Sequence, residues 1–252
     1  MLGRARTPDV VAWHEVECGS YAADLPLWEE LAAGGGGPIL ELGCGAGRVA
    51  LHLGRLGYEV CGIDVDAALV GTVTSRADAE RLPVRARHDD ATGFALDETF
   101  ALALAPMQLV QIVGGAAKRR GLLASVAAHL RPGGVLAAPL VESHSLPEFE
   151  PDADRAGVPL PDVRELDGWI FSSLPLAVRD REGALAIQRL RQSVSPSGEL
   201  AEEVDITELD PLSPAQLEVE AQAAGLRAAG RRQISETDAH VGSTVCLLEA
   251  AR

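Results

Sequence analysis

Three alternate glycines follow a short apolar run in the first fifth of the chain: Gly43, Gly45 and Gly47. Glycine has no Cβ, so a backbone with glycine at alternate positions can turn sharply and approach a ligand closely. Glu41 precedes the glycines, and Asp64 ends the next apolar run. That spacing is typical of nucleotide-binding folds in which a carboxylate accepts both ribose hydroxyls. These residues therefore predict a cradle for a cofactor that contains a nucleoside.

The glycine spacing distinguishes two classes of cofactor. A dinucleotide site has the pattern G-x-G-x-x-G, in which the third glycine lets a helix N-terminus face a pyrophosphate. Here Arg48 occupies the position of that third glycine. Glu41 is a carboxylate, which repels a pyrophosphate and attracts an ammonium group. The spacing favours a cofactor with an ammonium group, and a dinucleotide-dependent oxidoreductase on a similar fold is the less favoured alternative.

The run from Glu41 to Gly47 resembles motif I of the class I S-adenosylmethionine-dependent methyltransferases. The resemblance covers residues 38–141 and continues in four further segments: the strand ending at Asp64, Asp89-Asp-Ala91, Ala105-Pro-Met-Gln108 and Leu130-Arg-Pro-Gly-Gly-Val135. One position departs from the family, which often has an acidic residue where this chain has Ala101. That residue is usually not a ligand contact, so the resemblance holds.

The resemblance implies S-adenosylmethionine as cofactor, no metal, and a set of cofactor contacts. Asp64 would hold the ribose, and Asp90 the adenine amino group, with Asp89 as the close competitor. Arg48 would pair with the cofactor carboxylate. The implied cofactor-binding residues are Glu41, Gly43, Cys44, Gly45, Gly47, Arg48, Asp64, Val65, Asp89, Asp90, Ala91, Ala105, Pro106 and Gln108.

The same resemblance implies an α/β fold with a Rossmann-like seven-stranded sheet. Its strand order would be 3-2-1-4-5-7-6, with the seventh strand antiparallel and helices on both faces. We expect a single domain in four parts: a helical cap over 1–33, a cofactor-binding core over 34–142, an insert or lid over 143–210, and a last helix and two strands over 211–252. Alternating apolar residues predict three antiparallel strands in the insert, over 169–179, 184–194 and 199–209. The cap is predicted as two helices with a break at Pro26.

Three residues are candidates for a general base near the methyl acceptor: His144, His240 and Tyr21. Ligands of open α/β sheets collect at the carboxyl ends of the strands, where both histidine loops are predicted, and each side chain can take or relay a proton. Each also has a structural interpretation, as a solvent-facing loop histidine, a residue of a capped turn, or a packing residue of the cap. His14 and the other histidines are predicted to be structural or surface residues.

The composition restricts the partners. The chain has 252 residues and a formal net charge of -15, which argues against nucleic acid because nucleic-acid binding needs clustered Lys and Arg. No run approaches 18 apolar residues and the N-terminus lacks an apolar signal core, so we expect a cytoplasmic protein without membrane contact. The four cysteines show no C-x-x-C spacing and are predicted to be reduced. We expect a monomer or homodimer.

The sequence thus predicts an enzyme that transfers a methyl group from S-adenosylmethionine to an N or O atom of a small metabolite by in-line displacement. Transfer from a sulfonium mainly requires alignment and desolvation, and only an oxygen or a protonated amine needs a base. A catalytically silent protein that binds S-adenosylmethionine as a partner or sensor is the alternative. Ala101 and the lack of an unmistakable base keep that alternative open.

Overall fold

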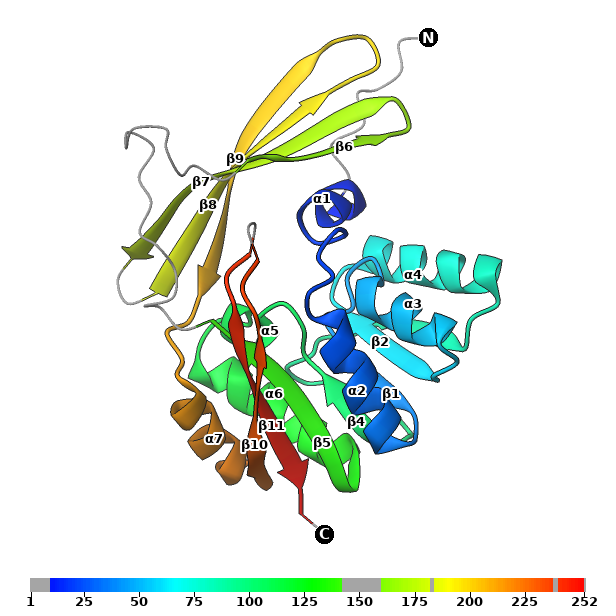
Figure 1. Cartoon of the computed structure of the whole chain (residues 1–252), viewed down its shortest axis with the longest axis vertical. Helices are drawn as coiled ribbons and strands as arrows, with labels where there is room; N and C mark the ends of the chain where they lie inside the picture. Colours follow the sequence, from blue (N-terminus) through cyan, green and yellow to red (C-terminus); the bar gives the residue numbers. More distant parts are fainter. Residues whose placement is uncertain (1–9, 142–159, 182–183, 238–239, 252) are drawn as a thin grey trace.

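The computed structural model describes residues 10–141, 160–181, 184–237 and 240–251. At its centre is a seven-stranded sheet with the order β10-β11-β5-β4-β1-β2-β3 (Figure 1). Strand β11 is antiparallel to both β5 and β10, and the other pairs are parallel. This is the predicted order, with β10 as the sixth strand and β11 as the seventh. The bounds are β1 Ile39–Leu42, β2 Val60–Asp64, β3 Val84–His88, β4 Phe100–Leu104, β5 Leu130–Leu140, β10 Leu226–Ile234 and β11 Ser243–Ala250.

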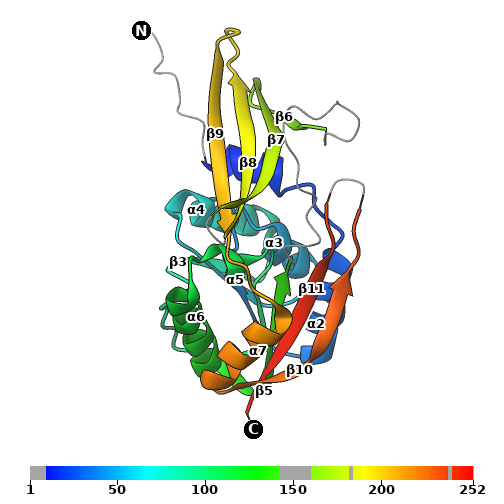
Figure 2. The same cartoon turned by 90° about the vertical axis from the view of Figure 1, so that its left-hand side faces the viewer.

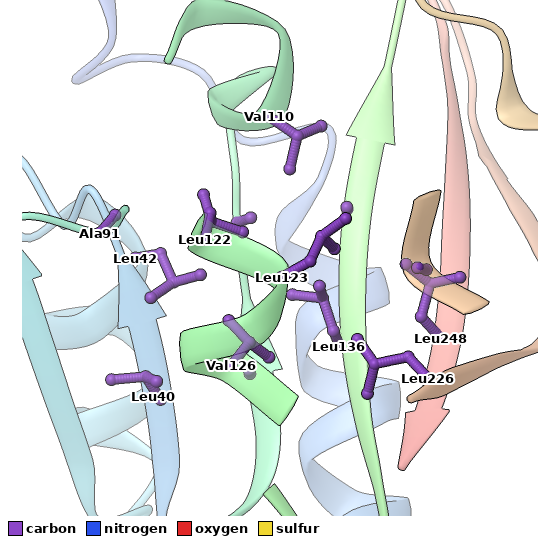
Figure 3. Close-up of a cluster of buried hydrophobic side chains, with 14 of the residues drawn as sticks. Leu40, Leu42, Ala91, Val110, Leu122, Leu123, Val126, Leu136, Leu226 and Leu248 are labelled. Carbon is purple, nitrogen blue, oxygen red and sulfur yellow. The ribbon is translucent and has the colours of Figure 1, made fainter. Parts of the chain in front are cut away.

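Helices cover both faces of this sheet, because its central strands are apolar on both sides. Ile39 packs with the α2 and α3 side chains, whereas Leu40 and Leu42 pack with α6 and α7. Figure 3 shows part of the apolar cluster that contains Leu40 and Leu42, with Leu122 and Leu123 of α6 facing the strands. The helices are α2 Leu25–Gly35, α3 Arg48–Arg55, α4 Ala67–Glu80, α5 Leu109–Ile112, α6 Ala116–His129 and α7 Pro214–Ala223.

A second, antiparallel sheet has the order β6-β7-β8-β9 and lies beyond the carboxyl ends of the parallel strands (Figures 1 and 2). Its strands are β6 Asp162–Leu166, β7 Trp169–Arg181, β8 Ala184–Val194 and β9 Leu200–Leu209. The prediction of three strands was wrong by one, because β6 was missed. Asp167 and Gly168 join β6 to β7, and both have positive φ (51° and 78°), as a two-residue Asp-Gly hairpin requires.

The N-terminal cap consists of α1 Val10–Glu17 and α2 Leu25–Gly35. The two helices were predicted, but the break is not at Pro26. Pro26 lies in the first turn of α2, where its missing N–H has no helical partner to lose and its fixed φ favours the helix. The break is the segment 18–24, which turns between the two helices.

Candidate cofactor and acceptor site

The glycine loop leaves β1 and enters α3 with an unusual backbone. Gly43, Gly45 and Gly47 have φ values of 61°, 54° and 91°, a region that residues with a Cβ rarely adopt. Hydrogen bonds from the loop to β2 hold it in place: Cys44 N donates to Ile63 O at 3.0 Å, and Gly45 N donates to Asp64 Oδ2 at 2.8 Å. The alternate glycines of the sequence are thus a requirement of this turn.

Asp64 lies at the tip of β2 beside that loop. Its second oxygen, Oδ1, accepts a hydrogen bond from Asp66 N at 2.9 Å. Each oxygen of an ionised carboxylate can accept about two hydrogen bonds, so both retain capacity for ligand hydroxyls. The next side chain, Val65, is 65% exposed, which leaves an apolar surface beside the carboxylate.

Glu41 lies beneath the loop and is almost fully buried, with 3% of its surface exposed. Its Oε2 atom has no hydrogen-bond partner among the residues that the structure describes. Burial raises the pKa of Glu41 to about 8, although the positive charge of Arg48 and a backbone hydrogen bond from Ala50 act against the rise. A buried carboxylate oxygen without a partner is costly. This observation fits a site completed by a cation such as an amino-acid ammonium group.

Asp89 and Asp90 follow β3. Asp89 N donates to Asp64 O at 3.0 Å, which continues the pairing of the two strands. Asp90 Oδ1 accepts hydrogen bonds from Thr92 N and Oγ1, both at 2.8 Å, and these bonds lower the pKa of Asp90. The Asp90 side chain is exposed and the following Ala91 is buried. Asp90 is therefore ionised, and its own turn orients the side chain. Its contact with the adenine amino group stays a prediction.

The loop after β4 contains Ala105 and Pro106, both buried, followed by two residues with left-handed backbones. Met107 and Gln108 have φ values of 52° and 58°, a left-handed backbone that is uncommon for residues other than glycine. Gln108 Nε2 donates to Ser243 Oγ at 3.1 Å, at the start of β11. The Gln108 side chain therefore reaches toward the β10–β11 connection.

Arg48 begins α3 and forms a two-pronged ion pair with Asp24 of the cap. Its two terminal nitrogens lie 2.6 and 2.7 Å from the carboxylate oxygens, and Nη1 also donates to Tyr21 O at 2.9 Å. The Arg48 and Asp24 side chains are only 9% and 2% exposed. In the structure the carboxylate partner of Arg48 is Asp24, and the pairing of Arg48 with the cofactor carboxylate stays a prediction. Arg48 thus fastens the cap onto the helix that follows the glycine loop.

Tyr21 and His240, two of the predicted base candidates, lie together. Their ring centroids are 4.6 Å apart, and the Arg48 guanidinium carbon lies 5.2 Å from the Tyr21 ring centroid. Burial lowers the pKa of His240 below its usual value, so the imidazole is neutral near pH 7. His240 N donates to Thr237 Oγ1 and Thr237 N donates to His240 O, which fixes the turn. The third candidate, His144, lies outside the described residues.

His14 was predicted to be structural or surface, yet it contacts the glycine loop. Ala46 N donates to His14 Nδ1 at 3.4 Å, and the imidazole fills the space that a Cβ on Gly45 would need. Burial lowers the pKa of His14, and the nearby Asp64 carboxylate partly offsets this effect. No local pattern identifies this contact, because His14 and Ala46 are far apart in the sequence and meet only when α1 packs over the loop.

A cavity of about 410 Å³ lies between the α1–α2 connection, the glycine loop, α3 and α4. Its wall includes His14, Tyr21 and Arg48, so the cap does not seal against α3. No helix in the described part of the chain is long and apolar enough to cross a membrane. Among the same residues, no three His, Cys, Asp or Glu side chains gather as a set of metal ligands.

Comparison with protein families gives one match, to the model described as "Methyltransferase domain", over residues 39–134. Curated relatives match parts of the chain, among them a hemagglutinin and an O-methyltransferase. Hemagglutinin 1 of Eikenella corrodens is 37% identical over 95 residues, which cover 38% of this chain and 31% of that protein. The ubiquinone biosynthesis O-methyltransferase of Nitrobacter winogradskyi is 34% identical over 101 residues, which cover 40% and 37% of the two chains. The chain spans about a third of the length of these relatives.

A solved structure extends the likeness to the whole chain. The sugar N-methyltransferase KedS8 from Streptoalloteichus sp. has a TM-score of 0.76 to this protein, with coverage of 100% of this chain and 96% of that one. Sequence identity over the match is 15%, so this likeness is one of fold. It includes the regions outside residues 39–134, which the family model does not reach.

Proposed function

We propose that this protein transfers the methyl group of S-adenosylmethionine to an N or O atom of a small metabolite. Residues 39–134 form a class I S-adenosylmethionine-dependent methyltransferase domain, as the sequence predicted, and the whole chain has that fold. The described relatives and neighbours include an O-methyltransferase and a sugar N-methyltransferase, which supports both acceptor atoms. The formal net charge of -15 supports a small-molecule acceptor over a nucleic acid.

The residues around the glycine loop match the parts of the cofactor. Glu41 would hold the ammonium group, Asp64 the ribose hydroxyls and Val65 the adenine face, with Asp90 or Asp89 at the adenine amino group. When bound, S-adenosylmethionine supplies an electrophilic methyl group on a positively charged sulfur. The buried and unpartnered Oε2 of Glu41 is the observation that carries this assignment, because an ammonium group would supply the hydrogen-bond donor that this oxygen lacks.

His240 and Tyr21 would act on the acceptor. The neutral His240 imidazole can accept a proton from an ammonium or a hydroxyl as the acceptor atom attacks, and the Tyr21 ring packs against the imidazole at a tilt of 40°. Alignment of the acceptor with the methyl group supplies most of the acceleration, so removal of the base slows the reaction without abolishing it. His144, which lies outside the described residues, stays a further candidate.

Isothermal titration calorimetry tests the cofactor assignment. We expect S-adenosylmethionine and S-adenosylhomocysteine to bind and NAD not to bind. Glu41→Gln should weaken S-adenosylmethionine, because an amide does not offset the charge of the ammonium group. The exposed Glu30→Gln serves as the control that leaves binding unchanged. Binding of NAD alone would overturn the proposal.

The alternative is a protein that binds the cofactor but transfers no methyl group. The contact between the Tyr21 and His240 rings favours the enzyme, because it places a neutral base beside the cap that covers the glycine loop. Release of S-adenosylhomocysteine, measured by mass spectrometry with a panel of amino and hydroxy sugars, separates the two. Cofactor binding with no turnover for any acceptor class would support the silent protein.

A further inference from the structure

Helix α1 packs with one side against the β6–β9 sheet. Trp13 meets Phe171 of β7 edge to face, with ring centroids 5.2 Å apart. The Glu17 carboxylate accepts three hydrogen bonds: from Ser173 Oγ at 2.8 Å and from Arg191 Nε and Nη2 at 2.7 Å each. The helix and the insert are therefore joined by both an apolar and an ionic contact.

The ion pair between Glu17 and Arg191 is partly shielded from water. The Glu17 and Arg191 side chains are 15% and 18% exposed, and the guanidinium carbon lies 5.4 Å from the Trp13 ring centroid. Nη1 of Arg191 donates to Asp205 Oδ1 at 2.8 Å, which fixes the arginine within the sheet. Charge-assisted hydrogen bonds with two prongs are directional, so this contact sets the position of α1.

The same helix holds the glycine loop. His14 accepts a hydrogen bond from Ala46 N at 3.4 Å. Glu15 binds Nη1 of Arg76 at 2.6 Å, and that nitrogen also donates to Ala46 O at 3.0 Å. Both backbone polar groups of Ala46 are thus held from α1, one directly and one through Arg76. The helix links the insert to the loop that precedes α3.

We propose that Arg191 is a positioning residue for the cofactor loop, acting through Glu17 and α1 on Ala46. The insert, which would form the acceptor wall, thereby sets how tightly the loop holds the cofactor. This inference rests on the proposed function for the statement that the loop binds S-adenosylmethionine. Its mechanical part, that Arg191 steadies residues 43–49, is independent of any ligand.

Hydrogen exchange of the ligand-free full chain tests the mechanical part. In Arg191→Met the amides of residues 43–49 should exchange faster than in the wild type. Asp205→Asn is the matched control, because it removes the negative charge beside Arg191 within the sheet and leaves the contact with Glu17. Glu17→Gln is the second variant should Arg191→Met fold poorly. If the amides of residues 43–49 exchange no faster in Arg191→Met and Glu17→Gln than in Asp205→Asn, the inference is wrong.

Calorimetry with S-adenosylhomocysteine tests the consequence for affinity. We expect the Kd of Arg191→Met to rise about fivefold, as for a typical coupling between sites, and that of Asp205→Asn to stay within about twofold. If Arg191 acts through α1, the double variant Arg191→Met with His14→Ala binds no more weakly than the weaker single variant. Additive losses would overturn the pathway. Failure of the wild type to bind would instead overturn the proposed function, while the exchange comparison still decides the inference.

Discussion

The side-chain amide of Gln111 forms both hydrogen bonds of the Val141 backbone: Nε2 donates to Val141 O at 3.0 Å, and Val141 N donates to Oε1 at 2.9 Å. Nε2 also donates to Asp210 O at 3.1 Å, and Asp210 N donates to Gln111 O at 2.8 Å. Val141 follows β5, where the chain leaves the core, and Asp210 follows β9, where it returns. The buried Gln111 thus forms hydrogen bonds at both ends of the insert.

Gln111→Leu should lower the free energy of unfolding by on the order of 2 to 4 kcal/mol, because it leaves backbone groups of Val141 and Asp210 buried without partners. Urea denaturation followed by circular dichroism measures the change. Gln108→Leu is the control: it removes a single side-chain hydrogen bond, to Ser243, and should cost about 1 kcal/mol. Equal losses in the two variants would contradict the role of Gln111.

Glu41→Gln should stabilise the ligand-free protein at pH 8.5 and have little effect at pH 5. The folded pKa of about 8 lies above the usual value of 4.5, so the folded state binds more protons than the unfolded state between these values. The free energy of unfolding of the wild type therefore falls as pH rises through that window. Thermal melts at both pH values measure the difference, and Glu30→Gln, on an exposed side chain 3.8 Å from Arg232, is the control. A stabilisation equal at both pH values would contradict the raised pKa of Glu41.

Cofactor binding should also depend on Glu41. Below pH 8 the carboxyl group is protonated, and an ammonium ligand favours the ionised form, so binding releases a proton and affinity rises with pH toward 8. Calorimetry in buffers of different ionisation enthalpy counts the proton. The Glu41→Gln variant should release none from this site, and an unchanged proton count would place the ammonium group elsewhere.

Asp64→Ala should weaken S-adenosylhomocysteine by on the order of 1 to 3 kcal/mol, through the loss of the carboxylate that we propose as the ribose contact. Asp66→Ala distinguishes this effect from a loss of stability. Asp66 caps α4 by accepting hydrogen bonds from Ala68 N and Leu69 N, so its removal should cost about 1 kcal/mol of stability and leave the affinity unchanged. Equal affinities of the wild type and Asp64→Ala would show that the ribose lies elsewhere.

The pKa of His240 should lie below 6.5 and depend on Tyr21. Tyr21→Ala exposes the imidazole and should move its pKa back toward 6.5, whereas Tyr21→Phe preserves the ring contact and the low value. NMR titration of the imidazole measures this without an acceptor. Once an acceptor is identified, kcat/KM should rise with pH through the pKa of His240. His240→Asn should remove this rise and slow methyl transfer by about 100-fold or more. An unchanged pH profile in His240→Asn would assign the base to another group.

The spacing of residues along the sequence was sufficient to predict the glycine loop and the strands around it. The glycines, the strand that ends at Asp64 and the order of five apolar segments lie within about one hundred residues, and parallel strands bring their carboxyl ends to one edge of a sheet. The missed strand β6 was also within reach, because Asp167-Gly168 is a strong hairpin signal.

The contacts that bring the cap and the insert to this edge were decided by packing across long sequence separations. Arg48 forms an ion pair with Asp24, and the His14 ring packs over Gly45. Gln111 forms hydrogen bonds with Val141 and Asp210. The sequence by itself determined the glycine loop, since glycine conformation is a local property, and the strand order followed from the resemblance of five ordered segments to the class I methyltransferases. Only the tertiary structure decided which charged and polar side chains meet, because such pairs depend on distance in space and leave no periodic trace along the chain.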